Sequence, residues 1–245
     1  MDFYLSKIDE ERFGYVIAKA KLESGDDVDA LLSAAREGKA EMVIVRLPTS
    51  ELALAQELER RGGILSDTLV YYQKKRIEQY SDDLPDGYRA CLVEASDIDA
   101  VGHIAAESFK GYFGHYHADP RLDRGACDAV YSSWALNSCR KGDLADDVIL
   151  IKAGQQIAAF ATLKIINSST FEGVLFGVAP EHQGKGLYLD LMKLSQNWGV
   201  ERKFGRMVVS TQITNVVVQK NWCRVGMEPL NSFYTFHVWV NDDSV

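Results

Sequence analysis

Through the first 75 residues of the chain, short apolar runs typical of β-strands alternate with segments whose apolar residues have helical spacing. Two segments place their apolar side chains three and four positions apart, which predicts amphipathic helices, and Gly62-Gly63 ends the second helix. The order β-α-β-α-β predicts a small α/β unit over residues 1–76, with a structural role or a role as a wall of the substrate site. The strands are expected at 14–22, 42–47 and 65–74, and the helices at 26–37 and 50–61.

A polar segment with Pro85 and Gly87 covers residues 77–87 and predicts a linker. A second unit is expected over residues 88–245, in which Ser96 and Asp99 form a capping box for its first helix. The same apolar periods predict helices through Ser108 and at 127–138, 187–200 and 215–225, and strands at 88–94, 148–152, 156–166, 171–178, 206–211 and 233–240. The chain is therefore predicted to be an α/β protein with a mixed sheet.

The most informative segment joins a strand to a helix through a glycine-rich turn. An apolar run ends at Val178, Gly184 and Gly186 follow, and a helix begins at Leu187. The first N–H groups of a helix lack internal partners and attract anions, so this turn is a candidate phosphate site. A tight connection without a ligand has the same pattern. The P-loop and dinucleotide-binding spacings are excluded, because Leu187 and Leu189 stand where those motifs need other residues.

The whole segment resembles motif A of the GCN5-related N-acetyltransferase (GNAT) family, from Val178-Ala179-Pro180 to the turn itself. One position departs from that pattern, since Tyr188 replaces a Gly or Ala. The resemblance covers about residues 88–240 and implies acyl-CoA as co-substrate, with no metal. It further implies that the pantetheine arm contacts the backbone of Phe176, Gly177 and Val178. The pyrophosphate would lie on the amides of Gln183, Gly184, Lys185, Gly186, Leu187 and Tyr188.

A second motif of that family is similar to residues 215–227, and it departs at the position of the family's acid. By resemblance, Asn215 contacts the CoA arm, although a simple helix cap is the alternative. Trp222 stands where the family has the Tyr that protonates the leaving thiolate. Because an indole N–H has no usable acidity, Trp222 either donates a hydrogen bond to the thiolate or packs in the core. Tyr234 and Cys223 are candidate substitute acids, and the resemblance implies the Val178 N–H as the oxyanion donor.

Aromatic, His, Asp and Arg side chains are concentrated between Phe109 and Arg124, in a segment expected to be a loop. In an extended backbone His115 and His117 would point the same way, which makes either a candidate proton acceptor. Arg121 and Arg124 are candidate phosphate ligands. Acceptor binding by this loop is favoured over a solvated loop or metal ligation by the two His. The candidate substrate-binding residues are Tyr112, His115, Tyr116, His117, Arg121, Tyr131 and Trp134.

The segments His115-Tyr116-x-Ala118-Asp119-Pro120 and Tyr131-x-x-Trp134 resemble a narrower type, the TDP-fucosamine acetyltransferases. The opening Arg12-Phe13-Gly14-x-x-Ile17-Ala18-Lys19 is similar as well. This resemblance implies a dTDP-linked amino-deoxy sugar as acceptor, a precursor of surface polysaccharide such as lipopolysaccharide O-antigen. Tyr131 and Trp134 would line the acceptor site. Attack is expected to be direct, in a ternary complex, because no Cys or Ser occupies a nucleophile motif.

Composition narrows the function further. The chain has 245 residues, 47% of them hydrophobic, and a net charge of −8, without a basic block to bind nucleic acid. Its four cysteines are scattered, as in a reduced cytoplasmic protein, and no apolar stretch reaches the roughly 18 residues of a membrane span. Two other functions stay open: a GNAT enzyme acting on a peptide, amino acid or antibiotic, and a non-catalytic acyl-CoA sensor. A homodimer is compatible with the family.

Overall fold

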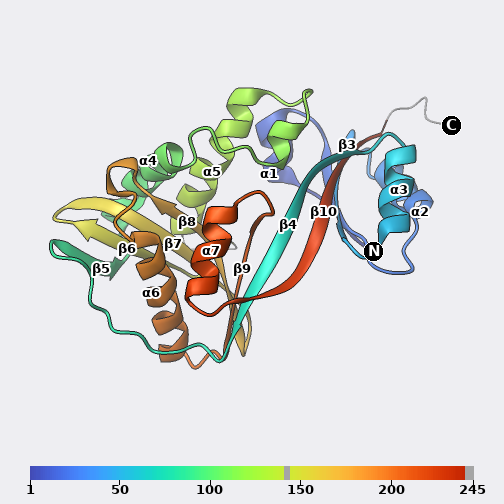
Figure 1. The fold of residues 1–245 in the computed structure, drawn as a ribbon. Coiled ribbons are helices and arrows are strands. Elements are labelled where there is room, and N and C mark those ends of the chain that lie inside the picture. Colours follow the sequence, from blue (N-terminus) through green and yellow to red (C-terminus); the bar gives the residue numbers. More distant parts are fainter. Residues whose placement is uncertain (141–143, 241–245) are drawn as a thin grey trace. The chain divides into compact units, whose positions relative to one another are not determined.

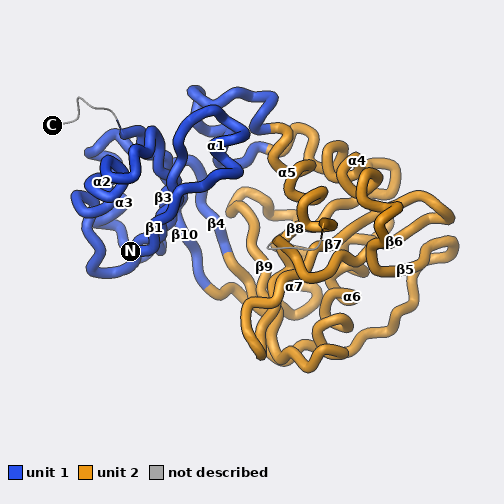
Figure 2. The backbone as a smooth tube through the Cα atoms, turned by 180° about the vertical axis from the view of Figure 1, so that it is seen from behind, with its two compact units in different colours: residues 1–70, 113–127, 231–245 blue, residues 71–112, 128–230 orange. Residues whose placement is uncertain are grey.

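The computed structural model describes residues 1–140 and 144–240, which form two compact units (Figure 2). Unit 1 contains residues 1–70, residues 113–127 and the C-terminal segment from Asn231 onward. Unit 2 contains residues 71–112 and 128–230. Each unit is therefore assembled from separate stretches of the sequence.

Unit 1 is a mixed sheet with the strand order β1-β2-β3-β10-β4. Strands β2 and β3 are parallel, whereas β1–β2 and β3–β10 are antiparallel. The elements are β1 (Asp2–Leu5), α1 (Lys7–Phe13), β2 (Ile17–Lys21), α2 (Val28–Glu37), β3 (Met42–Pro48), α3 (Leu52–Arg60), the start of β4 (Ile64–Lys75), a 3-10 turn (His115–Ala118) and the end of β10 (Glu228–Trp239).

Alternation along the strands gives the unit 1 sheet two different faces. Ala18 and Ala20 on β2, Val43 and Val45 on β3, and Phe236 on β10 share one buried cluster. Apolar residues of α2 and α3 complete that cluster, as the helical spacing of the sequence predicts. The neighbouring residues of each strand point to the opposite face of the sheet.

Unit 2 is a mixed sheet with the strand order β4-β9-β8-β7-β6-β5. Its neighbours from β5 to β8 are antiparallel, whereas β8 and β9 are parallel. The elements are the end of β4, β5 (Tyr88–Leu92), a 3-10 turn (Ala95–Asp97), α4 (Ile98–Ser108), α5 (Arg124–Cys139), β6 (Asp147–Ala153), β7 (Gln156–Asn167), β8 (Thr170–Val178), a 3-10 turn (Pro180–His182), α6 (Leu187–Glu201), β9 (Arg206–Gln212), α7 (Val216–Arg224) and the start of β10.

Helices cover both faces of the unit 2 sheet. One buried cluster joins Leu191 of α6 and Trp222 of α7 to alternate residues of β6 and β7. The intervening residues of those strands pack with Val101 of α4 and Ala135 of α5. Figure 1 shows α6 and α7 together on one side of the strands and α4 on the other. The predicted α/β fold with a mixed sheet is confirmed.

Local details differ from the sequence predictions in three places. The capping box that precedes α4 is formed by Glu94 and Asp97, because the chain enters the helix through a 3-10 turn; the predicted pair of Ser96 and Asp99 is wrong. Strand β1 and helix α1 were not predicted. The segment 77–87 contains no helix or strand, and Asn197 of α6 hydrogen-bonds both backbone groups of Tyr80.

The compact units also divide the sequence differently from the predicted ranges 1–76 and 88–245. Strand β10 begins in unit 2, and its residues 233–239 pair with β3 of unit 1. Residues 113–127 likewise belong to unit 1. Among residues 1–140 and 144–240, no helix is long and apolar enough to cross a membrane.

Candidate acyl-CoA site

Strands β8 and β9 pair over only part of their length. The parallel ladder runs from Thr170–Arg206 to Gly173–Val209, although β8 continues to Val178 and β9 to Gln212. On its other edge β8 stays paired with β7 as far as Val178. The carboxyl ends of β8 and β9 therefore diverge while β8 itself stays anchored.

The backbone of β8 directs hydrogen-bonding groups into this divergence. The Leu175 N–H donates to the Thr162 hydroxyl of β7, and the Ala179 N–H donates to the Ala158 carbonyl. Because backbone groups alternate in direction along a strand, those of Phe176 and Val178 point to the β9 side. The Val178 carbonyl accepts hydrogen bonds from the Ser108 hydroxyl and the Gln183 amide. The Val178 N–H is thus directed to the same side, where a ligand between the strands would meet it.

The glycine-rich turn after β8 has the backbone geometry that its sequence predicts. Gly184 and Gly186 have φ values of +77° and +87°, a region that residues with a Cβ rarely adopt. Gly186 is the N-cap of α6, and its carbonyl accepts the N–H groups of Leu189 and Asp190. The N–H groups of Leu187 and Tyr188 precede the first of those bonds, so they are available to a ligand at the helix start.

A cavity of about 560 Å³ lies at this place in unit 2. It brings together the end of β8, the glycine-rich turn, the start of α6 and one face of α7. Its lining residues are Ser108, Phe109, Tyr112, Phe176, Gly177, Val178, His182, Gln183, Gly184, Gly186, Leu187, Tyr188, Leu189, Asn215, Val217, Val218, Asn221 and Arg224. Of the predicted cofactor-binding residues, Lys185 alone is missing from that lining; its ammonium lies 3.5 Å from Nδ1 of His182.

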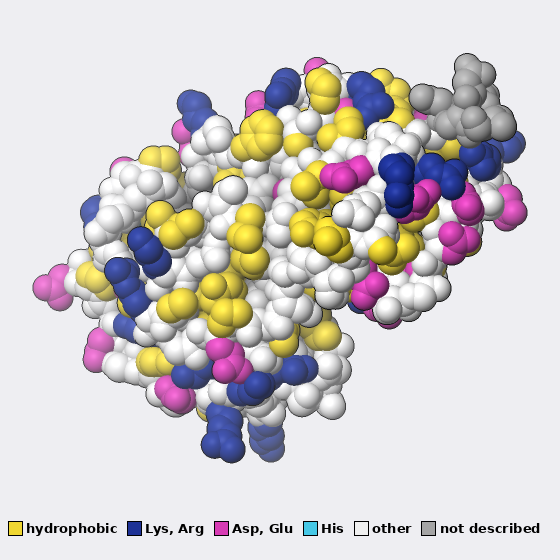
Figure 3. All heavy atoms as spheres, turned by 45° about the vertical axis from the view of Figure 1, so that its right-hand side comes forward, with side chains coloured by type: hydrophobic (Ala, Val, Ile, Leu, Met, Phe, Trp, Pro, Cys, Tyr) yellow, Lys and Arg dark blue, Asp and Glu magenta, His cyan; other side chains and the backbone are white. Residues whose placement is uncertain are grey.

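The charge of the cavity lining suits an anion. No Asp or Glu contributes to it, whereas Arg224 does. Arg224 is held by the Asn221 side-chain oxygen, at 3.0 Å, and both residues lie on α7. Elsewhere acidic and basic side chains are interspersed, as the face in Figure 3 shows. The overall net charge of −8 is therefore not the charge that a ligand meets in this cavity.

Asn215 and the other residues singled out near α7 have defined places. Asn215 is the N-cap of α7, where its side chain accepts the Val218 N–H and its amide donates to the Thr211 hydroxyl. It also lines the cavity, so capping and ligand contact are compatible roles. Cys223 is exposed on α7 outside the cavity lining. Tyr234 belongs to unit 1, where it packs against the cluster under α2 and α3.

The two departures from the family pattern are in contact with each other. The indole N–H of Trp222 donates to the Tyr188 hydroxyl at 3.0 Å. Trp222 is buried and packs against the Tyr72 ring, whereas Tyr188 is half-buried and lines the cavity. Burial raises the pKa of the Tyr188 phenol; the Trp222 hydrogen bond offsets part of that increase, and Tyr112 adds to it. Tyr188 therefore stays a neutral hydrogen-bonding group at physiological pH.

Four aromatic side chains of unit 2 form an aromatic cluster beside the cavity. The rings of Phe109 and Tyr131 stack with centroids 4.6 Å apart, and Tyr112 packs edge-on against both. Trp134 stacks on Tyr131 at 6.5 Å. Phe109 and Tyr112 also line the cavity. The structure thus joins the Tyr131-x-x-Trp134 motif to residues of the segment that precedes it by about twenty positions.

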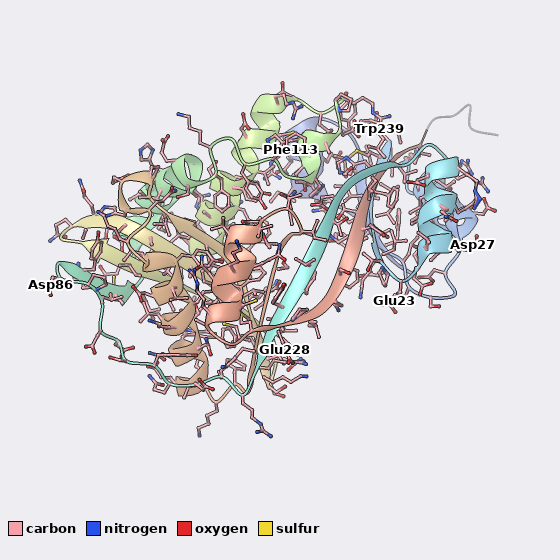
Figure 4. The ribbon with its side chains drawn as sticks, viewed as in Figure 1. Glu23, Asp27, Asp86, Phe113, Glu228 and Trp239 are labelled. Carbon is pink, nitrogen blue, oxygen red and sulfur yellow. The ribbon has the colours of Figure 1, made fainter. Side chains whose placement is uncertain are left out.

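The two loop histidines have their contacts inside unit 1. Residues 115–118 form a 3-10 turn, so the expected extended backbone is wrong and the two rings make separate contacts. Nδ1 of His115 lies 2.9 Å from Nε2 of His237. His117 is buried, and its Nδ1 accepts the Gly114 N–H, while its carbonyl accepts from Arg124. Phe113, labelled in Figure 4, packs against the His117 ring.

Asp119 organises the rest of this loop. Its carboxylate accepts hydrogen bonds from Arg121 and from the indole of Trp239, and it also contacts His237. Burial alone would raise its pKa, but these three partners outweigh burial and hold the pKa well below its ordinary value. Arg121 is consequently engaged in an ion pair and stacks over Trp239, labelled in Figure 4. To bind a phosphate as predicted, Arg121 would have to leave the Asp119 carboxylate.

A second buried carboxylate ties the loop to the first helix of unit 1. The Tyr116 hydroxyl donates to Asp9 at 2.8 Å, and Lys19 pairs with the same carboxylate at 2.6 Å. Burial raises the pKa of the Tyr116 phenol well above its ordinary value, and Asp9 raises it further. Tyr116 is therefore a structural hydrogen-bond donor in unit 1.

Sequence reasoning missed several cavity residues that belong to α4 and α7. Val217, Asn221 and Arg224 are four and three positions apart, which is the spacing of one helix face. That spacing was available in the sequence. Ser108, at the end of α4, reaches the Val178 carbonyl through a contact 70 residues apart, which no local pattern predicts. Among the described residues, no group of three His, Cys, Asp or Glu side chains is placed to hold a metal ion.

Comparison with known proteins agrees with this geometry. The model of the acetyltransferase (GNAT) family matches residues 98–227. The spore coat polysaccharide biosynthesis protein SpsD of Bacillus subtilis (strain 168) is 21% identical over 217 residues, which cover 86% of this chain and 71% of that protein.

Two solved structures share the fold at low sequence identity. One is a GCN5-related N-acetyltransferase from Sphaerobacter thermophilus, with a TM-score of 0.63, 13% identity and coverage of 90% of this chain and 73% of that one. The other is a GCN5-related N-acetyltransferase from Kribbella flavida, with a TM-score of 0.62, 16% identity and coverage of 91% and 81%.

Proposed function

The chain belongs to the acetyltransferase (GNAT) family and is an acyl-CoA-dependent N-acyltransferase, and on this premise we propose its acceptor and its site. We propose that it transfers an acyl group from acyl-CoA to the amine of a dTDP-linked amino-deoxy sugar, a precursor of surface polysaccharide. The divergence of β8 and β9 above the cavity is the observation that carries the site.

Acyl-CoA binds in the unit 2 cavity in this proposal. The pantetheine arm lies along Phe176, Gly177 and Val178, where the β8 backbone lacks a β9 partner in the ladder. The pyrophosphate lies on the N–H groups of the glycine-rich turn and the start of α6, because these point outward and α6 places its positive dipole end there. Arg224 adds a positive charge on the α7 side.

The chemistry needs a neutral amine, a donor for the oxyanion and an exit for the thiolate. The Val178 N–H points to the divergent side of β8 and is the proposed oxyanion donor. The amine attacks the thioester carbonyl directly: a C–N bond forms, the C–S bond breaks, and the proton lost by nitrogen balances the one gained by CoA sulfur. No covalent acyl-enzyme is needed for this sequence.

The aromatic cluster supports a nucleotide-linked acceptor. Phe109 and Tyr112 border the cavity, Tyr131 stacks on Phe109, and Trp134 stacks on Tyr131. Flat aromatic surfaces bind nucleobases by stacking. The similarity to SpsD supports a polysaccharide precursor as acceptor, since that protein is named for polysaccharide biosynthesis. His115 and His117 remain proposed acceptor-side residues, to be tested by mutation.

The test is an acceptor panel assayed with purified protein. Acetyl-CoA is incubated with dTDP-linked amino sugars, free amino sugars, lysine, short peptides and aminoglycosides, and free thiol is followed. Release with one dTDP-amino sugar, and with no other class, supports the proposal. Equal release with peptides or aminoglycosides contradicts the proposed acceptor and leaves acyl transfer intact.

The sensor alternative makes a different prediction in the same assay. A sensor binds CoA by calorimetry but releases no thiol with any amine, even when acetyl-CoA is replaced by longer acyl-CoAs. The sensor alternative is based on Trp222, which stands in the position of the family Tyr. The Tyr188–Trp222 contact weakens that reason, because a hydroxyl is present at the cavity after all.

A further inference from the structure

Tyr188 and Trp222, the two departures from the family pattern, are joined by a hydrogen bond. The position in α7 where the family has a tyrosine carries Trp222, whose indole has no proton to transfer. The first turn of α6, where the family has a small residue, carries Tyr188. The two side chains are 34 positions apart in the sequence, and the indole nitrogen lies 3.0 Å from the phenol oxygen.

In the hydrogen bond between Trp222 and Tyr188 the phenol hydrogen takes no part, so it can be donated to another acceptor. An indole N–H donates and never accepts, so Tyr188 is the acceptor in the contact. A phenol oxygen that accepts one hydrogen bond still has its own hydrogen to donate. Within residues 1–140 and 144–240, Trp222 is the one hydrogen-bond partner of the Tyr188 hydroxyl. Since Tyr188 lines the cavity, a ligand there is the available acceptor.

The protein neighbours of Tyr188 lie at the end of β8 and on α7. Its ring packs against Phe176 with centroids 5.7 Å apart, and Phe176 lies two residues before Val178 on β8. Trp222 cannot turn away, because it is 2% exposed and packs against Tyr72. The phenol is thereby held between β8, which carries the proposed oxyanion donor, and α7.

We propose that Tyr188 is a catalytic residue whose hydroxyl donates a hydrogen bond to the departing CoA sulfur, and that Trp222 is the positioning residue that orients it. This rests on the proposed acyl-CoA site. As the C–S bond breaks, the phenol donates a hydrogen bond to the developing thiolate and keeps its own proton, and the proton that the nitrogen loses on forming the amide bond is the one that the sulfur gains. Atoms and charge balance, and no phenolate accumulates.

The raised pKa of Tyr188 agrees with a hydrogen-bond donor that keeps its proton. Burial makes this phenol a weaker acid than a free one, so it stays neutral at physiological pH while it donates to the sulfur.

The first test measures the thiol of bound CoA and needs no acceptor. CoA is bound to the protein, and the thiolate absorbance is titrated against pH, with S-methyl-CoA as the blank. A hydrogen bond to the sulfur stabilises the thiolate, so Tyr188→Phe should raise the pKa of the bound thiol by about 1 or more. Trp222→Phe, which keeps a ring against Tyr72 but removes the N–H, should raise it by less.

A matched control separates this effect from general damage. Tyr72→Phe removes a hydroxyl that bonds Gln219 outside the cavity lining, so it should leave the bound thiol unchanged. Tyr188→Phe keeps the ring that packs on Phe176, and its melting midpoint verifies that it folds. A bound-thiol pKa that is the same in Tyr188→Phe and wild type overturns the proposal.

The second test uses turnover with the best acceptor of the panel. Tyr188→Phe should lower kcat about 100-fold, in the range of a lost acid or oxyanion donor, with the Kd for acetyl-CoA within about threefold. Loss of acetyl-CoA binding with unchanged kcat contradicts the role in the reaction. If wild-type protein does not bind CoA at all, the proposed site is wrong, and the inference that rests on it is overturned too.

Discussion

Replacing Gly186 with alanine tests the proposed phosphate contact, because its cost to folding and its cost to binding are separable. Gly186 has φ +87° at the N-cap of α6, and a Cβ built there meets no protein atom within 4 Å. The fold therefore loses only the backbone penalty of a left-handed residue, about 1–2 kcal/mol. For a chain of this size that lowers the melting midpoint by about 2–8 °C.

The binding cost is expected to be larger than this. The added methyl group stands in the open space beside the α6 N–H groups, where the pyrophosphate is proposed to lie. Losing one hydrogen bond to a charged group costs about 1.5–3 kcal/mol, so the Kd for CoA should rise about 10- to 100-fold. Isothermal titration calorimetry measures this Kd directly, and acetyl-CoA should show the same loss.

Gly154→Ala is the matched control for this experiment. Gly154 lies in the turn between β6 and β7 of unit 2, has φ +60°, and also has nothing within 4 Å of its Cβ position. It does not line the cavity. It should lower the melting midpoint by a similar amount with CoA affinity unchanged. An unchanged Kd in Gly186→Ala, or an equal loss of affinity in Gly154→Ala, would refute the assignment of the turn to the pyrophosphate.

Three further variants test packing, charge and the acceptor side. Gly177→Ala places a Cβ 2.4 Å from Cε1 of the buried Phe160, so it should cost about 1–3 kcal/mol of unfolding free energy in urea. Lys152→Met leaves the buried Asp97 carboxylate without its ion-pair partner and should cost about 3–5 kcal/mol at pH 7. Burial raises the pKa of Asp97, but Lys152 and the Glu94 N–H lower it below 3.8 overall. The ionised Asp97 therefore stabilises the fold above pH 3.8, and this stabilisation is lost as the pH falls through the lowered pKa. The cost of Lys152→Met should accordingly be smaller in unfolding measured at pH 3. His117→Ala should lower turnover with the acetyl-CoA Kd unchanged, and equal losses in both would contradict an acceptor-side role.

The strand, the glycine-rich turn and helix α6 were predictable because their signals are local. Gly184 and Gly186 mark the positive φ values, and the apolar spacing from Leu187 marks the helix. The β8–β9 ladder ends at Gly173–Val209, which leaves the backbone of Phe176, Gly177 and Val178 open to the pantetheine contacts that the family resemblance implies.

The composition of the two units was not predictable from such signals. Residues 113–127 join unit 1 through contacts made more than 100 positions away, such as Tyr116 with Asp9 and His115 with His237. Strand β10 pairs with β3 across nearly the whole sequence. Contacts at that separation leave no periodic trace in a single sequence, so the loop histidines were predicted as extended and lie instead in a 3-10 turn.

The Tyr188–Trp222 contact lies between these two cases. Both departures from the family pattern were visible in the sequence, but each was interpreted on its own. The 3.0 Å hydrogen bond between them, which no local pattern predicts, is the basis for the proposal that they compensate each other. The absence of the family tyrosine from α7 is therefore not enough to exclude catalysis by this chain.

The most direct test of the account is the identity of the product. Wild-type protein is incubated with carbon-13-labelled acetyl-CoA and a dTDP-amino-deoxy sugar, and the nucleotide sugar is analysed by mass spectrometry. The account predicts a gain of one labelled acetyl group on the sugar nitrogen, with an equal amount of free CoA. An unmodified sugar alongside labelled lysine, peptide or aminoglycoside from a parallel incubation would contradict it.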